Sequence, residues 1–168
     1  MVKDFGNTEY FTNRELSWIK FDERVLGEAR DKTYPLFERL KFLSISASNL
    51  DEFFMVRVAS LVDMVNAGYT KKDIAGMSAK TQLSYILDET QRLVASQYST
   101  FNKSIVPELK IKGIRFVLKH EDLSAKQIEF VDDYFEKNVY PVLTPMAVDS
   151  SRPFPLIRNK SLNIGAFL

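Results

Sequence analysis

Three polar residues, Asn49, Asp51 and Glu52, interrupt an otherwise apolar, helix-patterned segment. When residues 49–66 are placed on a helical wheel at about 100° per residue, Asn49 and Glu52 fall on the polar face. The amide of Asn49 offers hydrogen-bond donors and an acceptor together, so it can cap a helix, or contact a ligand or a neighbouring domain. Small residues at positions 44 and 46–48 leave room for a flat ligand or another backbone. Local chemistry alone favours the cap and leaves the ligand contact open.

Asp51 projects into the apolar stripe of the same wheel, one turn ahead of Met55. A buried carboxylate is costly unless it is paired or hydrogen-bonded. At a helix start it would accept free backbone N–H groups and meet the positive end of the helix dipole, and this is the favoured interpretation. The alternative is an ion pair with Arg57, Arg39 or a basic residue outside this chain.

Groups that commonly perform catalysis are scarce in this sequence. Its one histidine, His120, stands beside Glu121 in a polar segment, where a solvated surface position is the favoured interpretation. The six glycines are scattered and form no phosphate-binding loop. The absence of cysteine excludes thiolate catalysis and cysteine-ligated metals. The sequence therefore predicts no complete active site of a common type, and neither a catalytic nor a metal-ligating residue is assigned.

The bulk composition is typical of a soluble globular protein, with 45% hydrophobic and 27% charged residues in a chain of 168. A net charge of +1 argues against a dominant nucleic-acid surface. The first residues lack the apolar core of a signal peptide, and no run approaches the roughly 20 apolar residues of a membrane span. We therefore expect a cytoplasmic protein with no nucleic-acid partner and no transmembrane segment. Peripheral association with a membrane stays open.

Helical signals dominate the first two thirds of the chain. Thr12 and Glu15 form a capping-box pattern that predicts a helix over residues 12–30. A second helix is expected from Pro35, and it either turns near residues 44–48 or continues to Asn66, where Asn-Ala-Gly is a stop signal. A third is expected from about Ser78 to about Leu109, although Pro107 can end it earlier.

The pattern changes after residue 113. Residues 114–118, 139–143 and 161–168 are prone to form strands, and Ser124 with Gln127 predicts a helix reaching about Asn138. The expected fold is thus a mainly α N-terminal helical bundle over 1–108, followed by the opening part of an α/β (α+β) domain over 109–168. An apolar final strand with few partners indicates the front part of a longer protein.

Several mixed-residue motifs closely resemble the N-terminal region of the polyphosphate kinase family, type 1. They are residues 13–18 (NRELSW), 35–43 (PLFERLKFL) and 48–58 (SNLDEFFMVRV). Further on, residues 143–145 (LTP), 153–155 (PFP) and 161–163 (SLN) resemble the opening of that family's middle domain. The family often has His before Pro-Phe-Pro, whereas this chain has Arg152. That difference weakens any role assigned to this loop.

The resemblance implies a function that composition and spacing alone do not show. The parent enzyme would reversibly transfer the terminal phosphate of ATP to inorganic polyphosphate, using Mg²⁺ and a phosphohistidine that lies outside these residues. It would work as a homodimer, with the magnesium ligands also outside this chain. In the family, the asparagine of the Asn-Leu-Asp-Glu-Phe motif contacts the nucleotide, which makes Asn49 the ATP-binding candidate here.

Positive charge near the first two helices has two interpretations. Arg14, Arg24, Arg39 and Lys41 can line a phosphate path, or they can be ordinary solvated charges, and none is assigned a catalytic role. Under the family interpretation, residues 1–168 alone should be inactive and should bind ATP weakly.

Two alternatives to the enzyme interpretation remain open. One is a non-enzymatic helical interaction module. The other is a regulatory nucleotide-binding module, which predicts that the isolated chain binds ATP tightly and loses that binding on Asn49→Ala.

Overall fold

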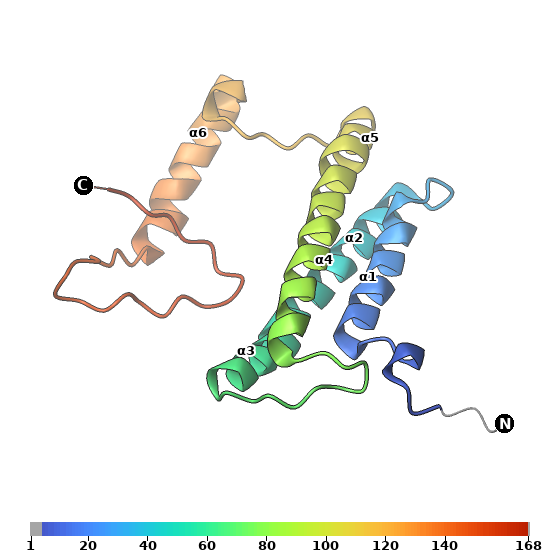
Figure 1. Cartoon of the computed structure of the whole chain (residues 1–168). Coiled ribbons are helices and arrows are strands. Elements are labelled where there is room, and N and C mark those ends of the chain that lie inside the picture. Colours follow the sequence, from blue (N-terminus) through green and yellow to red (C-terminus); the bar gives the residue numbers. More distant parts are fainter. Residues whose placement is uncertain (1–4, 168) are drawn as a thin grey trace. The chain divides into compact units, whose positions relative to one another are not determined.

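The computed structural model describes residues 5–167. They divide into two compact units, with the boundary between Phe116 and Val117. Each unit is described by itself (Figure 1). The domain boundary expected at 108/109 falls inside a helix of the first unit, α5 (Val106–Ile111), and stays a prediction.

The first long helix, α1 (Arg14–Arg30), follows a short 3₁₀ turn, η1 (Thr8–Tyr10). Its cap is Asn13, whose Oδ1 accepts hydrogen bonds from the backbone N–H groups of Glu15 and Leu16, each at 3.0 Å. The expected capping box at Thr12 is therefore wrong. Asn13 is a stronger cap than threonine, and its Nδ2 also donates to Asp73 at 2.6 Å, which fixes it in place.

A single continuous rod follows, made of α2 (Leu36–Phe53), the π-helical segment η2 (Phe54–Val58) and α3 (Ala59–Asn66). No turn occurs at residues 44–48, so the longer of the two expected helices is confirmed. Asn49 and Asp51 lie inside α2 rather than at a helix start. The backbone N–H groups there are already bonded within the helix, so the capping interpretations of both residues are wrong.

The stop signal after α3 is confirmed. Gly68 has φ +69°, and the N–H groups of Gly68 and Tyr69 donate to the carbonyls of Val65 at 3.1 Å and Met64 at 2.9 Å. This is the Schellman arrangement, which needs the left-handed conformation that glycine adopts without strain.

A second rod comprises α4 (Ala79–Thr100), the π-helical segment η3 (Phe101–Ile105) and α5. Ser78 caps it by accepting from the N–H of Thr81 at 3.2 Å, as expected. Pro107 does not end the rod. Proline lacks an N–H and its ring crowds the carbonyl four residues earlier. The carbonyl four residues before Pro107 belongs to Lys103, which lies in the π segment η3, and the wider turn there gives the proline ring more room.

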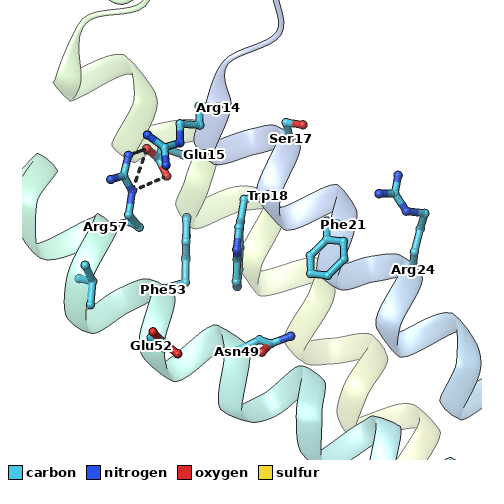
Figure 2. A pocket seen from close by; sticks show the side chains of 11 residues that line it. Arg14, Glu15, Ser17, Trp18, Phe21, Arg24, Asn49, Glu52, Phe53 and Arg57 are labelled. Atoms are coloured by element: carbon cyan, nitrogen blue, oxygen red, sulfur yellow. Dashed lines mark hydrogen bonds and ion pairs between the residues drawn. The ribbon is translucent and has the colours of Figure 1, made fainter.

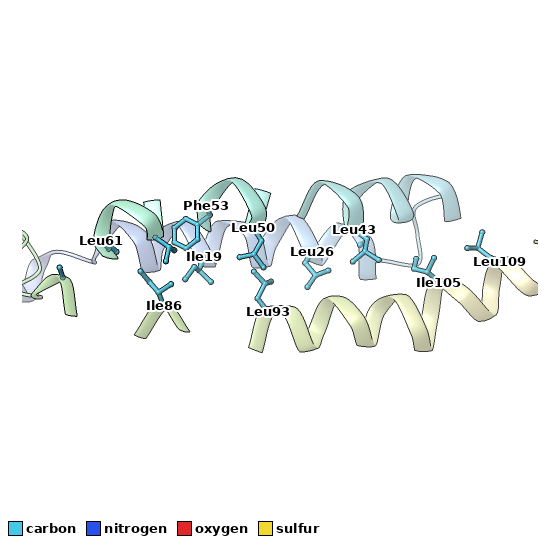
Figure 3. Close-up of a cluster of buried hydrophobic side chains, with 13 residues drawn as sticks. Ile19, Leu26, Leu43, Leu50, Phe53, Leu61, Ile86, Leu93, Ile105 and Leu109 are labelled. Atoms are coloured by element: carbon cyan, nitrogen blue, oxygen red, sulfur yellow. The ribbon is translucent and has the colours of Figure 1, made fainter. Parts of the chain in front are cut away.

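The core of the first unit forms where α1, the α2–α3 rod and the α4–α5 rod meet (Figure 3). Its fully buried members include Ile19, Phe53, Ile86, Leu93 and Ile105. They recur at helical spacing along all three elements, which confirms the predicted N-terminal helical bundle.

The second unit contains η4 (His120–Asp122), α6 (Ala125–Tyr134), the π segment η5 (Phe135–Val139) and the 3₁₀ turn η6 (Tyr140–Val142). Gln127 Oε1 accepts from the Ser124 N–H at 2.9 Å, so the expected helix start is confirmed. Within residues 5–167 no strand forms, and the strands expected at 114–118, 139–143 and 161–167 are wrong. A strand needs a partner for its backbone N–H and C=O groups, and the described residues supply none. Position 168 of the last expected strand lies outside the described residues.

Among the described residues, no helix has both the length and the apolar character needed to cross a membrane.

Candidate functional site

An open pocket of about 510 Å³ lies between α1 and the α2–η2 segment of the first unit (Figure 2). The α1 side contributes Arg14, Glu15, Ser17, Trp18, Phe21 and Arg24. The opposite side contributes Asn49, Glu52, Phe53, Val56 and Arg57. The pocket thus brings together the NRELSW and SNLDEFFMVRV motifs, which are far apart in the sequence.

Aromatic rings form one part of the pocket. Trp18 stacks on Phe53 with ring centroids 4.4 Å apart and planes 3° from parallel. Phe53 is only 2% exposed and anchors the pair in the core. Phe21 lies on the other side of Trp18 and is 45% exposed (Figure 2). One face of the indole is therefore covered by Phe53, and the other is turned towards the pocket side that holds Phe21.

Asn49 enters the pocket from the middle of α2. Its Nδ2 donates to Asp22 Oδ1 at 3.1 Å, whereas its Oδ1 has no hydrogen-bond partner among residues 5–167. Every fully buried side-chain nitrogen or oxygen in the described chain has a partner. The Oδ1 of Asn49 is consequently reachable from solvent and can accept a hydrogen bond from a ligand.

Asp22 lies directly behind Asn49 and is 0% exposed. Its second oxygen, Oδ2, accepts from Ser46 Oγ at 3.2 Å, and Ser46 Oγ accepts from Gln97 Nε2 at 2.8 Å. Burial raises the pKa of Asp22, and the hydrogen bonds from Asn49 and Ser46 partly oppose that rise. The chain of polar groups links α1, α2 and α4 beneath the pocket.

The pocket's far end is closed by an ion pair between Glu15 and Arg57. Arg57 Nε donates to both carboxylate oxygens of Glu15, at 3.2 and 3.1 Å, and its Nη2 also contacts Oε1. Glu15 is 6% exposed, and the hydrogen bond from Arg57 to this carboxylate raises the pKa of the guanidinium. Arg57 is therefore neutralised within the wall.

The four candidate cations separate into two groups. Arg14 and Arg24 line the pocket, and within residues 5–167 neither forms an ion pair with an acidic side chain. Arg24 lies over the ring of Phe21, 5.9 Å from its centroid. Arg39 and Lys41 lie elsewhere, because Arg39 is buried against Glu108 and Lys41 pairs with Glu38 at 3.6 Å. Only Arg14 and Arg24 of the four can act on a ligand in this pocket.

Comparison with known proteins decides the family. Residues 11–117 match the family model "Polyphosphate kinase N-terminal domain", and residues 126–168 match "Polyphosphate kinase middle domain". The chain belongs to the polyphosphate kinase family.

Individual polyphosphate kinases support the same assignment. A "Polyphosphate kinase" of Bacillus anthracis is 49% identical over 168 residues, and one of Lactiplantibacillus plantarum is 54% identical over 161. These matches cover 99% and 96% of this chain but only 24% and 22% of those proteins. The crystal structure of the polyphosphate kinase from Porphyromonas gingivalis matches with a TM-score of 0.69 and 32% identity, over 88% of this chain and 20% of that one. The chain thus spans about a quarter of the length of the curated polyphosphate kinases it matches.

The remaining candidates lie outside the pocket between α1 and α2. His120 is exposed, and its Nε2 lies 3.1 Å from Asp132 Oδ1, so the surface interpretation is confirmed. Arg152 is exposed in the second unit, where its backbone N–H donates to the carbonyl of Asp149 at 3.2 Å. In the described part of the chain, no three acidic, histidine or cysteine side chains gather closely enough to hold a metal.

Sequence reasoning missed several residues of the pocket. Trp18 belonged to a quoted motif but carried no assigned role, and Phe21 and Asp22 were not singled out. The available signal was their helical spacing: Trp18 and Phe21 are three residues apart on the same face of α1, and Asp22 follows.

Proposed function

We propose that the protein containing this chain is an ATP–polyphosphate phosphotransferase. It reversibly transfers the terminal phosphate of ATP to inorganic polyphosphate through a phosphohistidine outside residues 1–168. The observation that carries the proposal is the match of both consecutive regions to polyphosphate kinase domains, at about half identity to named relatives.

In this proposal the pocket between α1 and α2 holds the nucleotide base. The exposed face of Trp18 is a stacking surface, and Asn49 Oδ1 is a hydrogen-bond acceptor at its edge. Pockets of about this volume accommodate small organic ligands, with apolar walls for affinity and a few polar atoms for orientation. Asn49 is accordingly the ATP-binding residue of this chain.

Arg14 and Arg24 are the groups of this chain that face the phosphates. Phosphoryl transfer depends on dense positive charge around the transferred group, and two exposed arginines on one side of an open pocket supply only part of it. The remaining cations, the histidine nucleophile and the ligands of Mg²⁺ therefore lie in other parts of the protein. Mg²⁺, when bound there, offsets the negative charge of the ATP phosphates.

The wider context completes the proposal. Residues 126–168 join an α/β middle domain in the whole protein, consistent with their match to that family model. We further propose that the whole protein is a cytoplasmic homodimer that uses ATP or ADP and polyphosphate. Fractionation of cells would test whether the protein also associates peripherally with a membrane.

The direct test measures polyphosphate synthesis by the full product of the native gene and by its Asn49→Ala variant. We expect KM for ATP to rise about tenfold, the equivalent of one hydrogen bond with its orienting effect, while kcat changes less than threefold. Such a pattern indicates lost binding rather than lost chemistry. Asn102→Ala, an exposed asparagine of η3 outside the pocket, is the matched control and should leave both constants unchanged.

Other outcomes separate the alternatives. If the gene ends after residue 168, or its full product makes no polyphosphate, the kinase proposal fails for this protein. Tight ATP binding by residues 1–168 alone, lost on Asn49→Ala, would instead support the regulatory nucleotide-binding module.

A further inference from the structure

Asp22 is a buried acid with no cationic partner among the described residues. It is 0% exposed, and its contacts are the side chains of Asn49 and Ser46. A buried carboxylate is costly when it lacks a counter-charge. An apolar residue would fill the same space between α1 and α2 without that cost, so the structural role of a core residue does not explain an acid here.

The hydrogen bonds around Asp22 run in one direction. Gln97 Nε2 donates to Ser46 Oγ, so the Ser46 hydroxyl directs its own proton to Asp22 Oδ2. Asp22 Oδ1 is left to accept from Asn49 Nδ2 at 3.1 Å. A carboxylate offers acceptors only. Whichever way the Asn49 amide turned, Asp22 would therefore bind its nitrogen and reject its oxygen.

The consequence appears on the pocket side. The Asn49 amide is planar, so holding Nδ2 against Asp22 directs Oδ1 away from it. Oδ1 is accessible to solvent, and Asn49 is one of the residues that line the pocket. We propose that Asp22 is a positioning residue that makes Asn49 present an acceptor, and thereby selects purine bases that carry an amino group at position 6. This inference rests on the proposed nucleotide site and names the base that the site prefers.

The chemistry of the base makes the selection measurable. Adenine presents an N–H donor at position 6, which complements Asn49 Oδ1. Hypoxanthine is of nearly the same size but presents a carbonyl oxygen there, so the two oxygens would face each other without a proton between them. Specificity of this kind comes from an unfavourable contact with the wrong base as well as from a bond to the right one.

The test compares ATP with inosine triphosphate as phosphate donors for the full gene product. In Asp22→Asn, the side chain at position 22 keeps its size, but its oxygen accepts from Ser46 and its nitrogen donates to Asn49. The Asn49 amide would therefore turn the other way and present its Nδ2 donor in place of Oδ1. We expect the ratio of kcat/KM for ATP to that for inosine triphosphate to fall about tenfold, the value of one discriminating hydrogen bond. The fall in this ratio should come from the KM values of the two nucleotides.

The exchanged pair Asp22→Asn/Asn49→Asp provides a rescue. The new amide at position 22 accepts from Ser46 and donates to the new carboxylate at position 49, whose second oxygen again faces the pocket as an acceptor. We expect this variant to recover the preference for ATP to within about threefold of wild type. A residue that serves only to hold the helices together would not restore base selectivity in this way.

Thr90→Val is the matched control, because Thr90 is 4% exposed and its hydroxyl bonds only to carbonyls of its own helix. It should lower thermal stability without changing the ratio. The inference is overturned if folded Asp22→Asn keeps the wild-type ratio, or if the folded exchanged pair shows no preference for ATP. Should Asp22→Asn not fold, the exchanged pair alone decides. An Asn49→Ala variant with unchanged KM for ATP overturns the nucleotide site itself, which is a separate result.

Discussion

Arg39 joins three helical elements through one buried guanidinium. It projects from α2 and is 1% exposed. Its Nε donates to the carbonyl of Ala29 at 3.0 Å, Nη2 to Ser104 Oγ at 2.7 Å, and Nη1 to Glu108 Oε2 at 2.7 Å. The end of α1, the π segment η3 and α5 are therefore linked at one point, and the only acid among these partners is Glu108.

This pairing predicts a specific dependence of stability on pH. The hydrogen bond from Arg39 lowers the pKa of Glu108 below its ordinary value of 4.5. Its contribution is therefore present above that ordinary value and lost as pH falls through the lowered one. We expect Glu108→Gln to reduce the free energy of unfolding by about 1 kcal/mol at pH 7, given the partial exposure of the carboxylate. Urea titrations of residues 1–168 at several pH values should show the difference from wild type shrinking as the pH falls below 4.5 and vanishing below the lowered pKa of Glu108.

Glu38→Gln is the control for this measurement. The Glu38–Lys41 pair is open to solvent, with a separation of 3.6 Å, so its loss should change the free energy of unfolding by less than about 0.5 kcal/mol. A deficit in Glu108→Gln that persists undiminished at low pH would show that the glutamate acts through packing rather than charge.

Single residues were the least predictable level of this molecule. The polar character of Asn49 was evident from the sequence, but asparagine is equally suited to a cap and to a ligand contact. Only the continuity of α2 through Phe53 decides against the cap. The role of Asp22 depends on Ser46 and Gln97, which lie 24 and 75 residues away in the chain. No local pattern reports such a contact.

At the scale of elements, two glycines in different helical settings test the role of backbone conformation. Gly68 ends α3 with φ +69°, and Gly27 lies inside α1; a Cβ at either position would meet nothing within 4 Å. A methyl group would therefore contact no neighbouring atom at either position, and the two positions differ only in their backbone conformation. We expect Gly68→Ala to destabilise the bundle by about 1 kcal/mol, because alanine is strained in the left-handed region.

Gly27→Ala should have the opposite sign and stabilise by roughly 0.5–1 kcal/mol, because alanine restricts the unfolded chain and favours the helix. Thermal melts of the two variants and wild type provide the comparison. Equal effects of the same sign would contradict the backbone argument.

Helix ends were predictable where a local hydrogen bond determines them. Ser78, Ser124 and Gly68 each act as their residue types indicate, and each forms its bond within a few residues. Thr12 failed because the adjacent Asn13 competes for the same N–H groups. The sequence could not predict the π segments, nor whether Pro107 ends its helix. Both depend on how the whole length of a helical rod packs along its neighbours.

At the scale of the whole molecule, the two units differ in how much they bury. The first has a continuous apolar core along its helices (Figure 3). In the second, none of residues 117–167 is buried, and Leu162, Ile164 and Phe167 are more than 90% exposed. Strand propensity was a poor guide there because propensity describes a fit to a sheet, and the described residues contain no sheet to join.

This contrast predicts two patterns of amide hydrogen exchange. In residues 1–168 alone, amides of α1, α2 and α4 should exchange only through global unfolding, whereas those of α6 and of 143–167 should exchange almost at the rate of an unfolded chain. Limited proteolysis should accordingly remove the second unit and leave a folded bundle that ends near Phe116.

In the full gene product, segments within 126–168 should become protected, since we propose that they pair inside an α/β middle domain. Exchange that stays fast there in the full product would remove that part of the proposal, while slow exchange in the isolated chain would show that the second unit folds unaided.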